Sequence, residues 1–329
     1  MHSKRCHSAR GAGEGVNKFI QKWRNKLPSA SRVAGAIQGV IGDKLPKSMQ
    51  IEMQFVAEGR PVADPVVSRQ HVCIFVHGSA DTEAGWSVKA PHLNFGQQLL
   101  VEFGAAPLYI RYNSGLAVSD NGESFAKLMH EFIARHKSVR KVTLIGHSMG
   151  GLVIHSAIYH ARAQNLGWHK KVHQVFLLGT PHAGAPLAKL AEKGEQILQF
   201  IPNPVTLIAA SVIGLRSRGL KDLSHGQRGL PAEGKILLPK TQYVFIAGGL
   251  QKKPKGFFNM LMGDGMVRHG SAHAEEAPVN GGAAEWLKKT IPWLNRAPRV
   301  HVEIVSGANH LALRTSPRVY EVISQYFQA

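Results

Sequence analysis

Cysteine is almost absent from this sequence, since only Cys6 and Cys73 occur among 329 residues. One lies in a polar terminal stretch and the other in an apolar run, so no disulfide framework or cysteine-based metal site follows from them. The sequence also has no internal repeat and no low-complexity tract. These absences leave the class of ordinary globular proteins.

Long hydrophobic runs are missing as well. The longest later apolar stretch, residues 204–215, is too short to span a bilayer. The basic start, Met1–His7, is not followed by a continuous apolar region of the kind a signal peptide needs. We therefore expect a soluble cytoplasmic protein that could also contact a membrane peripherally.

Acidic residues are scarce. Forty Lys and Arg stand against 21 Asp and Glu, which gives a formal net charge of +19. Such an excess is compatible with nucleic acid, anionic membranes, other polyanions or acidic substrates as partners, and also with plain solubility. No long basic run and no nucleic-acid-binding motif accompany it, so no specific nucleic-acid binding is expected.

Residues 1–48 form a basic N-terminal arm with ten Lys or Arg and two acids. Within it, Val16, Phe19, Ile20 and Trp23 have helical spacing with cations between them, so the arm is expected to be partly helical or flexible. Such a helix could lie on an anionic membrane surface or dock on its own domain.

Residues 49–329 show the pattern of one α/β domain. Their length and 44% hydrophobic content suit a loop-rich globular enzyme. Strand-like and helical stretches alternate, which predicts βαβ units in a mostly parallel central sheet with helices on both faces. The expected strands are 51–55, 72–76, 108–112, 142–145, 172–178, 243–247 and 300–305, and the expected helices are 95–103, 122–136, 149–163 and 317–327.

Residues 183–240 interrupt this alternation. They contain the apolar segment 201–215 and a basic stretch that follows it. An apolar insertion at this place is a candidate cap or lid over an acyl-binding pocket, and an ordinary buried helix is the alternative.

A G-x-S-x-G sequence, Gly146-His147-Ser148-Met149-Gly150, is the strongest motif. It follows the β-branched apolar run 142–145 and precedes an apolar helical pattern, which is the strand–turn–helix context that the motif requires. Glycine suits the first and last positions because the turn is too tight there for a Cβ. The motif predicts that Ser148 is a catalytic nucleophile.

A serine nucleophile needs a base and a carboxylate, and in this type of fold both follow it in the chain. His310 follows the last strand directly, and Asp264 lies between two glycines after the strand 243–247. A packed histidine and a solvated Asp-Gly turn are the alternative interpretations of these two residues. Glu303, within a strand, and Asp222, within the insertion, are weaker candidates for the acid.

Two backbone amides should form the oxyanion hole. One is the amide of Met149, directly after the nucleophile, and the other comes from the loop after an early strand. The turn His77-Gly78-Ser79 follows the strand 72–76, and Ser79 is the expected second donor.

No metal site or cofactor is predicted. His269 and His273 are four residues apart without a carboxylate or cysteine to complete a ligand set, and His155, His160, His169 and His173 show no H-E-x-x-H pattern. We interpret these histidines as structural or surface residues.

Several stretches together resemble bacterial α/β-hydrolases of the lipase/esterase type, in particular the GPI-inositol-deacylase-like branch. They are Ile145–Val153, Leu178–Pro186, Gly263–Val267 and Tyr109–Gly115 followed by Asn121-Gly122. The resemblance covers roughly residues 70–329 and implies that Ser148, Asp264 and His310 are nucleophile, acid and base. The family often continues the acid motif with Val-Pro, whereas Arg268 and His269 follow Val267 here.

The sequence thus predicts a serine hydrolase that cleaves carboxylic esters, lipid-like or of medium chain length, through an acyl-serine intermediate. An acyltransferase, thioesterase or amidase could use the same triad. A non-catalytic module that binds anionic partners through its basic surface is the alternative from another class. The sequence predicts no oligomeric state.

Overall fold

The computed structural model describes residues 30–86, 93–182, 217–225, 237–249 and 299–328. The predicted helix in 16–24, the apolar segment 201–215 and the predicted acid Asp264 lie outside the described residues.

An eight-stranded sheet forms the centre of the described structure, with the strand order β2-β1-β4-β3-β5-β6-β7-β8. Strand β1 pairs antiparallel with β2 and β4, and the pairs from β4 through β3 to β8 are all parallel. This confirms the prediction of a mostly parallel sheet. The strands are β1 Gln54–Ala57, β2 Arg60–Val62, β3 His71–Val76, β4 Ala106–Arg111, β5 Lys141–His147, β6 Val172–Leu178, β7 Gln242–Gly249 and β8 Val300–Ser306.

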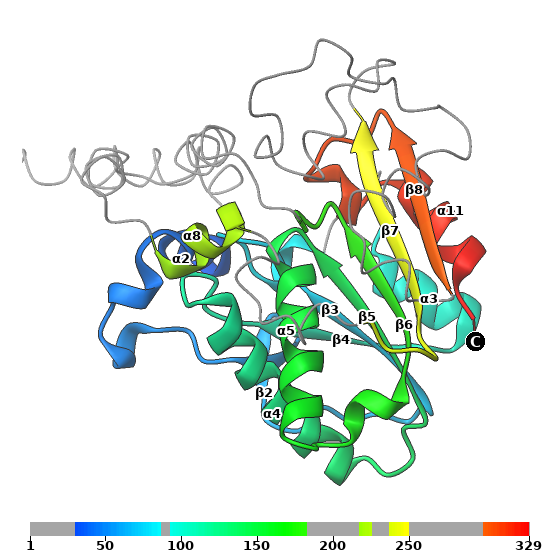
Figure 1. The fold of residues 1–329 in the computed structure, drawn as a ribbon, viewed down its shortest axis with the longest axis horizontal. Helices are drawn as coiled ribbons and strands as arrows, with labels where there is room; N and C mark the ends of the chain where they lie inside the picture. Colours follow the sequence, from blue (N-terminus) through cyan, green and yellow to red (C-terminus); the bar gives the residue numbers. More distant parts are fainter. Residues whose placement is uncertain (1–29, 87–92, 183–216, 226–236, 250–298, 329) are drawn as a thin grey trace, which may run out of the picture.

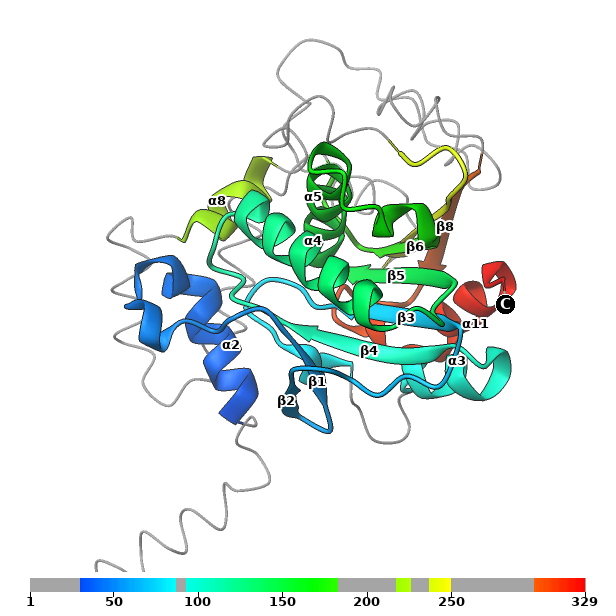
Figure 2. The ribbon, with the colours of Figure 1, turned by 90° about the horizontal axis from the view of Figure 1, so that it is seen from below.

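Helices cover both faces of the sheet (Figures 1 and 2). Helices α4 (Val118–Arg135) and α5 (Met149–Ala163) lie on one face, and α3 (Phe95–Phe103) and α11 (Pro317–Tyr326) lie on the other. Helices α2 (Ala30–Ile41) and α8 (Arg218–His225) lie beside each other at one end of the molecule. The short 3₁₀ helices are η1 Gly42–Lys44, η2 Lys47–Met49, η3 Glu83–Gly85, η4 Trp168–Lys171 and η9 Ala312–Arg314.

Strand β3 explains why the central strands lack polar alternation. Val72, Ile74 and Val76 point into the core under α4 and α5, whereas Cys73 and Phe75 point into the core under α3 and α11. Because both faces are covered, every residue of this strand is buried. Burial also raises the pKa of the Cys73 thiol.

Helix α3 coincides with the predicted helix 95–103 because local signals mark both of its ends. The Asn94 side chain accepts a hydrogen bond from the amide of Gln97 at 3.1 Å and caps the start. Gly104 ends the helix in a left-handed conformation with φ of 66°.

Helix α4 begins at Val118, four residues before the predicted start at Gly122. The amide of Val118 donates to the Asp222 carboxylate at 2.8 Å, so the first turn is capped by a residue about a hundred positions away. A signal of this kind cannot be recognised in the local sequence.

Strand β1 begins three residues later than the predicted strand 51–55 and ends two residues later. The amide of Ile51 donates to the Gln38 side chain of α2 at 3.3 Å instead of joining the sheet. Pro61, expected in a connection, lies in the edge strand β2, where a missing N–H is tolerated.

Residues 30–41 of the predicted basic arm are packed onto the domain. Helix α2 faces the loop after β3, where Cβ atoms added at Gly35 and Gly39 would collide with Asp81 and Ala80. The Ser31 hydroxyl donates to the Thr82 hydroxyl in the same loop at 3.0 Å. Residues 30–41 are therefore integral to the α/β domain.

Within the predicted cap region, the structure describes residues 217–225 and 237–240. Ser217 donates through its hydroxyl to the Gly39 carbonyl at 2.6 Å, which fixes the start of α8 on α2. In the described part of the chain, no helix combines the length and the apolar character needed to cross a membrane.

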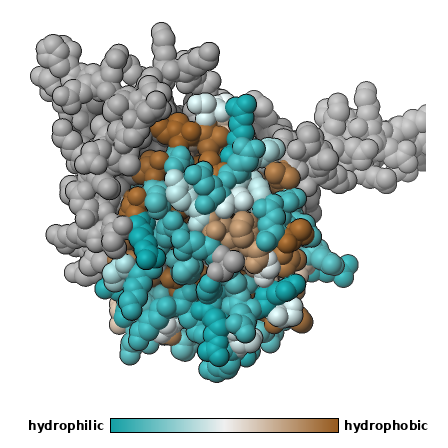
Figure 3. All heavy atoms as spheres, turned by 90° about the vertical axis from the view of Figure 1, so that its right-hand side faces the viewer, coloured by the Kyte–Doolittle hydropathy of each residue, from teal (hydrophilic) through white to brown (hydrophobic). Residues whose placement is uncertain are grey.

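Apolar surface is gathered toward one end of the face shown in Figure 3, and hydrophilic residues cover much of the remainder. Exposed large apolar side chains in the described residues include Ile304 of β8, which is 38% exposed, and Leu311, directly after the predicted base, which is 53% exposed.

Candidate active site

Ser148 occupies a strained turn between β5 and α5. Its backbone angles are φ 54° and ψ −123°, a combination that costs a non-glycine residue about 1–3 kcal/mol. Its amide donates to the Leu178 carbonyl of β6 at 2.9 Å, and Ser148 itself is only 4% exposed. The sharp turn predicted from the G-x-S-x-G motif is therefore present.

Gly150 shows why this turn requires small residues. A Cβ at Gly150 would collide with the carbonyl oxygens of Val76 and His77, at the end of β3. Because those atoms belong to the buried backbone of the last residue of β3 and the residue after it, they have no room to move away. The first turn of α5 can approach β3 only with glycine at this position.

We call residues 77–86, which follow β3, the His77 loop. It passes directly beside residues 146–150, which we call the elbow: a Cβ at Gly78 would lie 3.0 Å from Ser148 Cβ and 3.1 Å from His147 Nδ1. Ser79 is next in this loop, and Met149 is the first residue of α5. Their predicted roles as oxyanion-hole donors stay predictions.

His77 holds the His77 loop to the segment after β4. The Tyr112 amide donates to His77 Nε2 at 3.3 Å, so Nδ1 carries the proton and donates to the Gly78 carbonyl at 2.9 Å. The Tyr112 hydroxyl donates to the His77 carbonyl at 2.8 Å, and the two rings stack at 4.1 Å. Burial lowers the pKa of His77 to about 4, so this histidine is neutral and acts as a scaffold.

We call residues 307–316, which follow β8, the His310 loop. Gly307 turns the chain with φ of 82°, and the Asn309 side chain accepts from the Ala312 amide at 2.8 Å. The ring of His310 faces β6, since a Cβ at Gly179 would lie 3.0 Å from its Nδ1. Gly179 directly follows Leu178, whose carbonyl accepts from the Ser148 amide, so Ser148 and His310 both lie at the carboxyl end of β6.

His147, next to Ser148, contacts the His310 loop directly. Its Nε2–H donates to the His310 carbonyl at 2.8 Å, and the centres of the two imidazole rings are 4.7 Å apart. On its other side, the Trp86 ring lies edge-on to His147 at 6.3 Å. A chain of rings therefore runs from the His77 loop through the elbow to the predicted base.

The two weaker acid candidates have structural partners. The Asp222 carboxylate caps α4, as described above. The Glu303 carboxylate accepts a hydrogen bond of 2.5 Å from the Tyr326 hydroxyl of α11. Both side chains therefore hold helices in place, and Asp264 remains the predicted acid.

Buried histidines also lie behind the elbow. His155 of α5 and His182, after β6, have ring centres 5.5 Å apart, and His155 stacks on Tyr243. Burial lowers the pKa of His155 to about 4 and that of His182 well below its usual value. In the described residues, no group of three or more His, Cys, Asp or Glu is arranged to hold a metal ion.

Three residues that connect the loops of the site, Asp81, Trp86 and Arg314, were not singled out from the sequence. Asp81 and Arg314 form an ion pair, and Trp86 contacts His147. Asp81 and Trp86 belong to the loop after an early strand, which was a usable signal. Nothing in the sequence indicates that Arg314 pairs with a residue more than two hundred positions earlier.

Comparison with protein families finds a match for residues 115–200, about a quarter of the chain, to the PGAP1-like alpha/beta domain. The match includes the elbow and confirms the resemblance predicted from the motifs in that stretch. No match to a curated protein sequence was found.

Among solved structures, the chain is similar to the mature lipase BlEst2 of Bacillus licheniformis, with 19% identity and a TM-score of 0.47 over 83% of this chain and 96% of that one. A thermophilic esterase from Thermogutta terrifontis shows 16% identity and a TM-score of 0.42 over 78% and 89% of the two chains. Carboxylesterase CesB of Bacillus subtilis shows 14% identity and a TM-score of 0.43 over 79% of this chain and 84% of that one. The sheet order, the elbow and the family match give the chain an α/β-hydrolase fold with a PGAP1-like stretch at residues 115–200.

Proposed function

We propose that this chain is a serine hydrolase that cleaves carboxylic esters, with Ser148 as nucleophile, His310 as base and Asp264 as acid. The observation that carries the proposal is the strained backbone of Ser148, with φ 54° and ψ −123°, at the edge of the sheet that His310 also faces. Strain of this kind persists only where the surrounding structure enforces it, and it is concentrated at functional sites.

The proposed reaction has two halves. Ser148 Oγ attacks the ester carbonyl while His310 takes its proton, and the tetrahedral intermediate collapses when His310 returns that proton to the leaving alcohol. Water then attacks the acyl-serine with the same proton transfers, which releases the acid and restores Ser148. Asp264 orients the imidazole, and the amides of Met149 and Ser79 hold the negative oxygen.

We propose a lipid-like or medium-chain ester as the substrate class. The apolar segment 201–215 motivates this choice, and the exposed Leu311 beside His310 supports it. Contact with an anionic membrane through the basic residues of the arm fits the same class. Acyl transfer, thioester cleavage and amide cleavage use the same groups and differ in the products formed with competing alcohols, thiols or amines.

The test compares Ser148→Ala with Ser156→Ala on a panel of esters of increasing acyl length. Ser156 is a fully buried serine of the adjoining helix α5, so it controls for the loss of a buried hydroxyl. We expect Ser148→Ala to lower kcat by about 10⁶ and Ser156→Ala to retain turnover. Unchanged turnover in Ser148→Ala would exclude Ser148 as the nucleophile, and absence of turnover on every ester in the wild type would favour the non-catalytic alternative.

A further inference from the structure

An ion pair connects the His77 loop with the His310 loop. Asp81 lies two residues after Ser79, and Arg314 lies four residues after His310. The Asp81 carboxylate pairs with Arg314 Nη1, and both side chains are largely buried, with exposed fractions of 16% and 13%. This contact joins the backbone segment of a predicted oxyanion donor to that of the predicted base.

Gly85 leaves the space that the pair occupies. A Cβ at this position would collide with the Arg314 guanidinium and would lie 2.5 Å from Asp81 Oδ2. Gly85 belongs to the 3₁₀ helix η3 and has no left-handed backbone that would itself demand glycine. The absence of a side chain at Gly85 therefore lets the Arg314 guanidinium come within contact of the Asp81 carboxylate.

Arg32 of α2 is a further charged residue in this region, and its Nη2 donates to the Ala84 carbonyl at 3.1 Å. Burial, with a smaller contribution from the Arg32 charge, lowers the pKa of Arg314 to about 10. The guanidinium therefore stays charged at neutral pH. A buried charge of this kind is costly without its partner, so removing Asp81 should disturb Arg314 as well.

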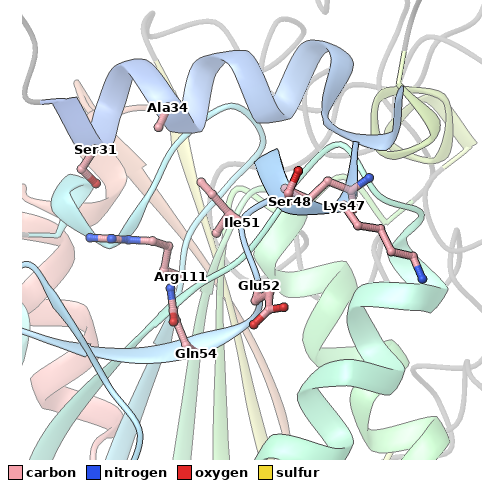
Figure 4. A pocket seen from close by; sticks show the side chains of 9 residues that line it. Ser31, Ala34, Lys47, Ser48, Ile51, Glu52, Gln54 and Arg111 are labelled. Atoms are coloured by element: carbon pink, nitrogen blue, oxygen red, sulfur yellow. The ribbon is translucent and has the colours of Figure 1, made fainter. Parts of the chain in front are cut away.

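Other polar contacts of the His77 loop are made with segments outside the His310 loop. Glu83 binds Arg111 of β4, with a distance of 2.7 Å from Arg111 Nε, and the Ala80 amide donates to the Ser114 hydroxyl at 2.9 Å. Figure 4 shows Ser31 of α2 and Arg111 of β4 beside one pocket of about 390 Å³. These contacts fix the His77 loop to α2, to β4 and to the segment after β4, whereas Asp81 extends to the His310 loop.

We propose that Asp81 and Arg314 are positioning residues whose ion pair keeps the His310 imidazole at the correct distance and orientation from the Ser79 amide. The inference rests on the proposed function and names a requirement of the same site. Ester cleavage needs base and oxyanion hole aligned on one carbonyl, and a misplacement of about 1 Å can cost on the order of 10²-fold in rate. A contact between the two loops is suited to prevent such a displacement.

Gly85→Ala is the sharpest test because it separates the pair while keeping both charges. Arg314→Met removes the cation, Arg314→Lys retains it, and Asp81→Asn removes the anion. Arg135→Met is the control, because it removes a partly exposed ion pair with Asp64 that lies far from the site. Arg135 is the last residue of α4 and precedes the start of β5, whereas the site lies at the carboxyl end of β5.

We expect Gly85→Ala and Arg314→Met to lower kcat by about tenfold to a hundredfold while KM changes little, at temperatures well below each variant's Tm. Arg314→Lys should recover most of the rate, and Arg135→Met should match the wild type. Combining Asp81→Asn with Arg314→Met should cost no more than the worse single change. If Arg314→Met does not fold, Gly85→Ala still decides the question.

A folded Gly85→Ala variant with wild-type kcat would overturn the inference, and so would an equal loss in Arg135→Met. The rate of Ser148 labelling by a fluorophosphonate distinguishes this failure from a failure of the proposed function. If wild-type Ser148 is not labelled, the proposed function is wrong and the inference falls with it. If Ser148 is labelled at the same rate in wild type and Gly85→Ala, only the positioning role is wrong.

Discussion

The two halves of the candidate site are built in different ways. The elbow is a run of five consecutive residues, 146–150, that begins in β5 and packs against β3 and β6, and Ser148 within it is 4% exposed. The His310 loop follows β8, an edge strand whose residues are mostly half-buried or exposed. It reaches the elbow through a hydrogen bond from a residue 163 positions away and the His77 loop through the Asp81–Arg314 pair.

The conformation of the elbow is therefore determined by residues adjacent in the sequence, and the position of the His310 loop by residues far apart in it. The conformation of Ser148 follows from its neighbours, because glycines allow the tight turn and buried strands hold it. The position of His310 follows from contacts that only the folded chain creates. Substitutions in the His310 loop and at its distant partners should therefore act on kcat, whereas substitutions that enlarge the elbow glycines should act on folding.

The largest effect that would sharpen this contrast is expected at Asp264. In a Ser-His-Asp triad the acid fixes the tautomer and orientation of the imidazole, so Asp264→Asn should lower kcat by about 10⁴ with the fold intact. The measurement is kcat on a short-chain ester, with the circular dichroism spectrum and Tm recorded for the same preparation.

Glu303→Gln and Asp222→Asn are the matched controls, since their carboxylates hold Tyr326 and the first turn of α4. We expect these two variants to lower Tm modestly and to keep kcat within about tenfold of the wild type. A mild effect of Asp264→Asn beside a severe effect of either control would move the acid role to that control residue.

A smaller effect is expected at His147, which joins the two halves. His147→Phe keeps a ring beside Trp86 but removes the N–H that binds the His310 carbonyl, so kcat should fall by about tenfold to a hundredfold with little change in KM. His147→Gln retains an N–H donor and should lose less.

His130→Phe is the control for that experiment. His130 Nδ1 also bonds a backbone carbonyl, that of Leu166 at 2.9 Å, but at the exposed surface of α4. Its kcat should equal that of the wild type. If His147→Phe retains full kcat, the hydrogen bond to the His310 carbonyl has no part in positioning the base.

The smallest effect concerns acid stability, which should be determined largely by the buried histidines of β3, the His77 loop and α5. Burial lowers the pKa of His71, His77 and His155 to about 4, whereas an unfolded histidine has a pKa near 6.5. Below about pH 6.5 these histidines bind protons in the unfolded chain, whereas in the folded chain they stay neutral until the pH approaches 4. The contribution of these residues to stability is therefore complete above pH 6.5 and is lost as the pH falls toward 4.

His155→Phe tests this expectation through the dependence of the unfolding free energy on pH between 7 and 4.5. Removal of one such histidine should reduce the slope by about one proton, or about 1.4 kcal/mol per pH unit. An identical slope in wild type and variant would show that His155 is protonated equally in both states.

Much of the fold was predictable from the sequence because its signals are local. Strand β6 and helix α3 have the bounds that the apolar patterns indicate, and Asn94 and Gly104 mark the ends of α3. The elbow was predictable for the same reason, since its strand, glycines and helix are contiguous.

The remainder depended on contacts between distant segments. The start of α4 is set by Asp222, the shift of β1 follows from Gln38, and residues 30–41 belong to the domain because two glycines of α2 fit over the His77 loop. His310 was identified by its place after the last strand. Its connections to His147 and, through Arg314, to Asp81 exist only in the folded chain.

The most direct test of the central claim is the site and rate of covalent labelling by a fluorophosphonate ester analogue, read by peptide mass spectrometry. We expect a single adduct on the peptide that contains Ser148 in the wild type and in Ser156→Ala, no adduct in Ser148→Ala, and labelling slowed by orders of magnitude in His310→Ala. Labelling of another residue, or an undiminished rate in His310→Ala, would contradict the assignment of Ser148 and His310 as nucleophile and base.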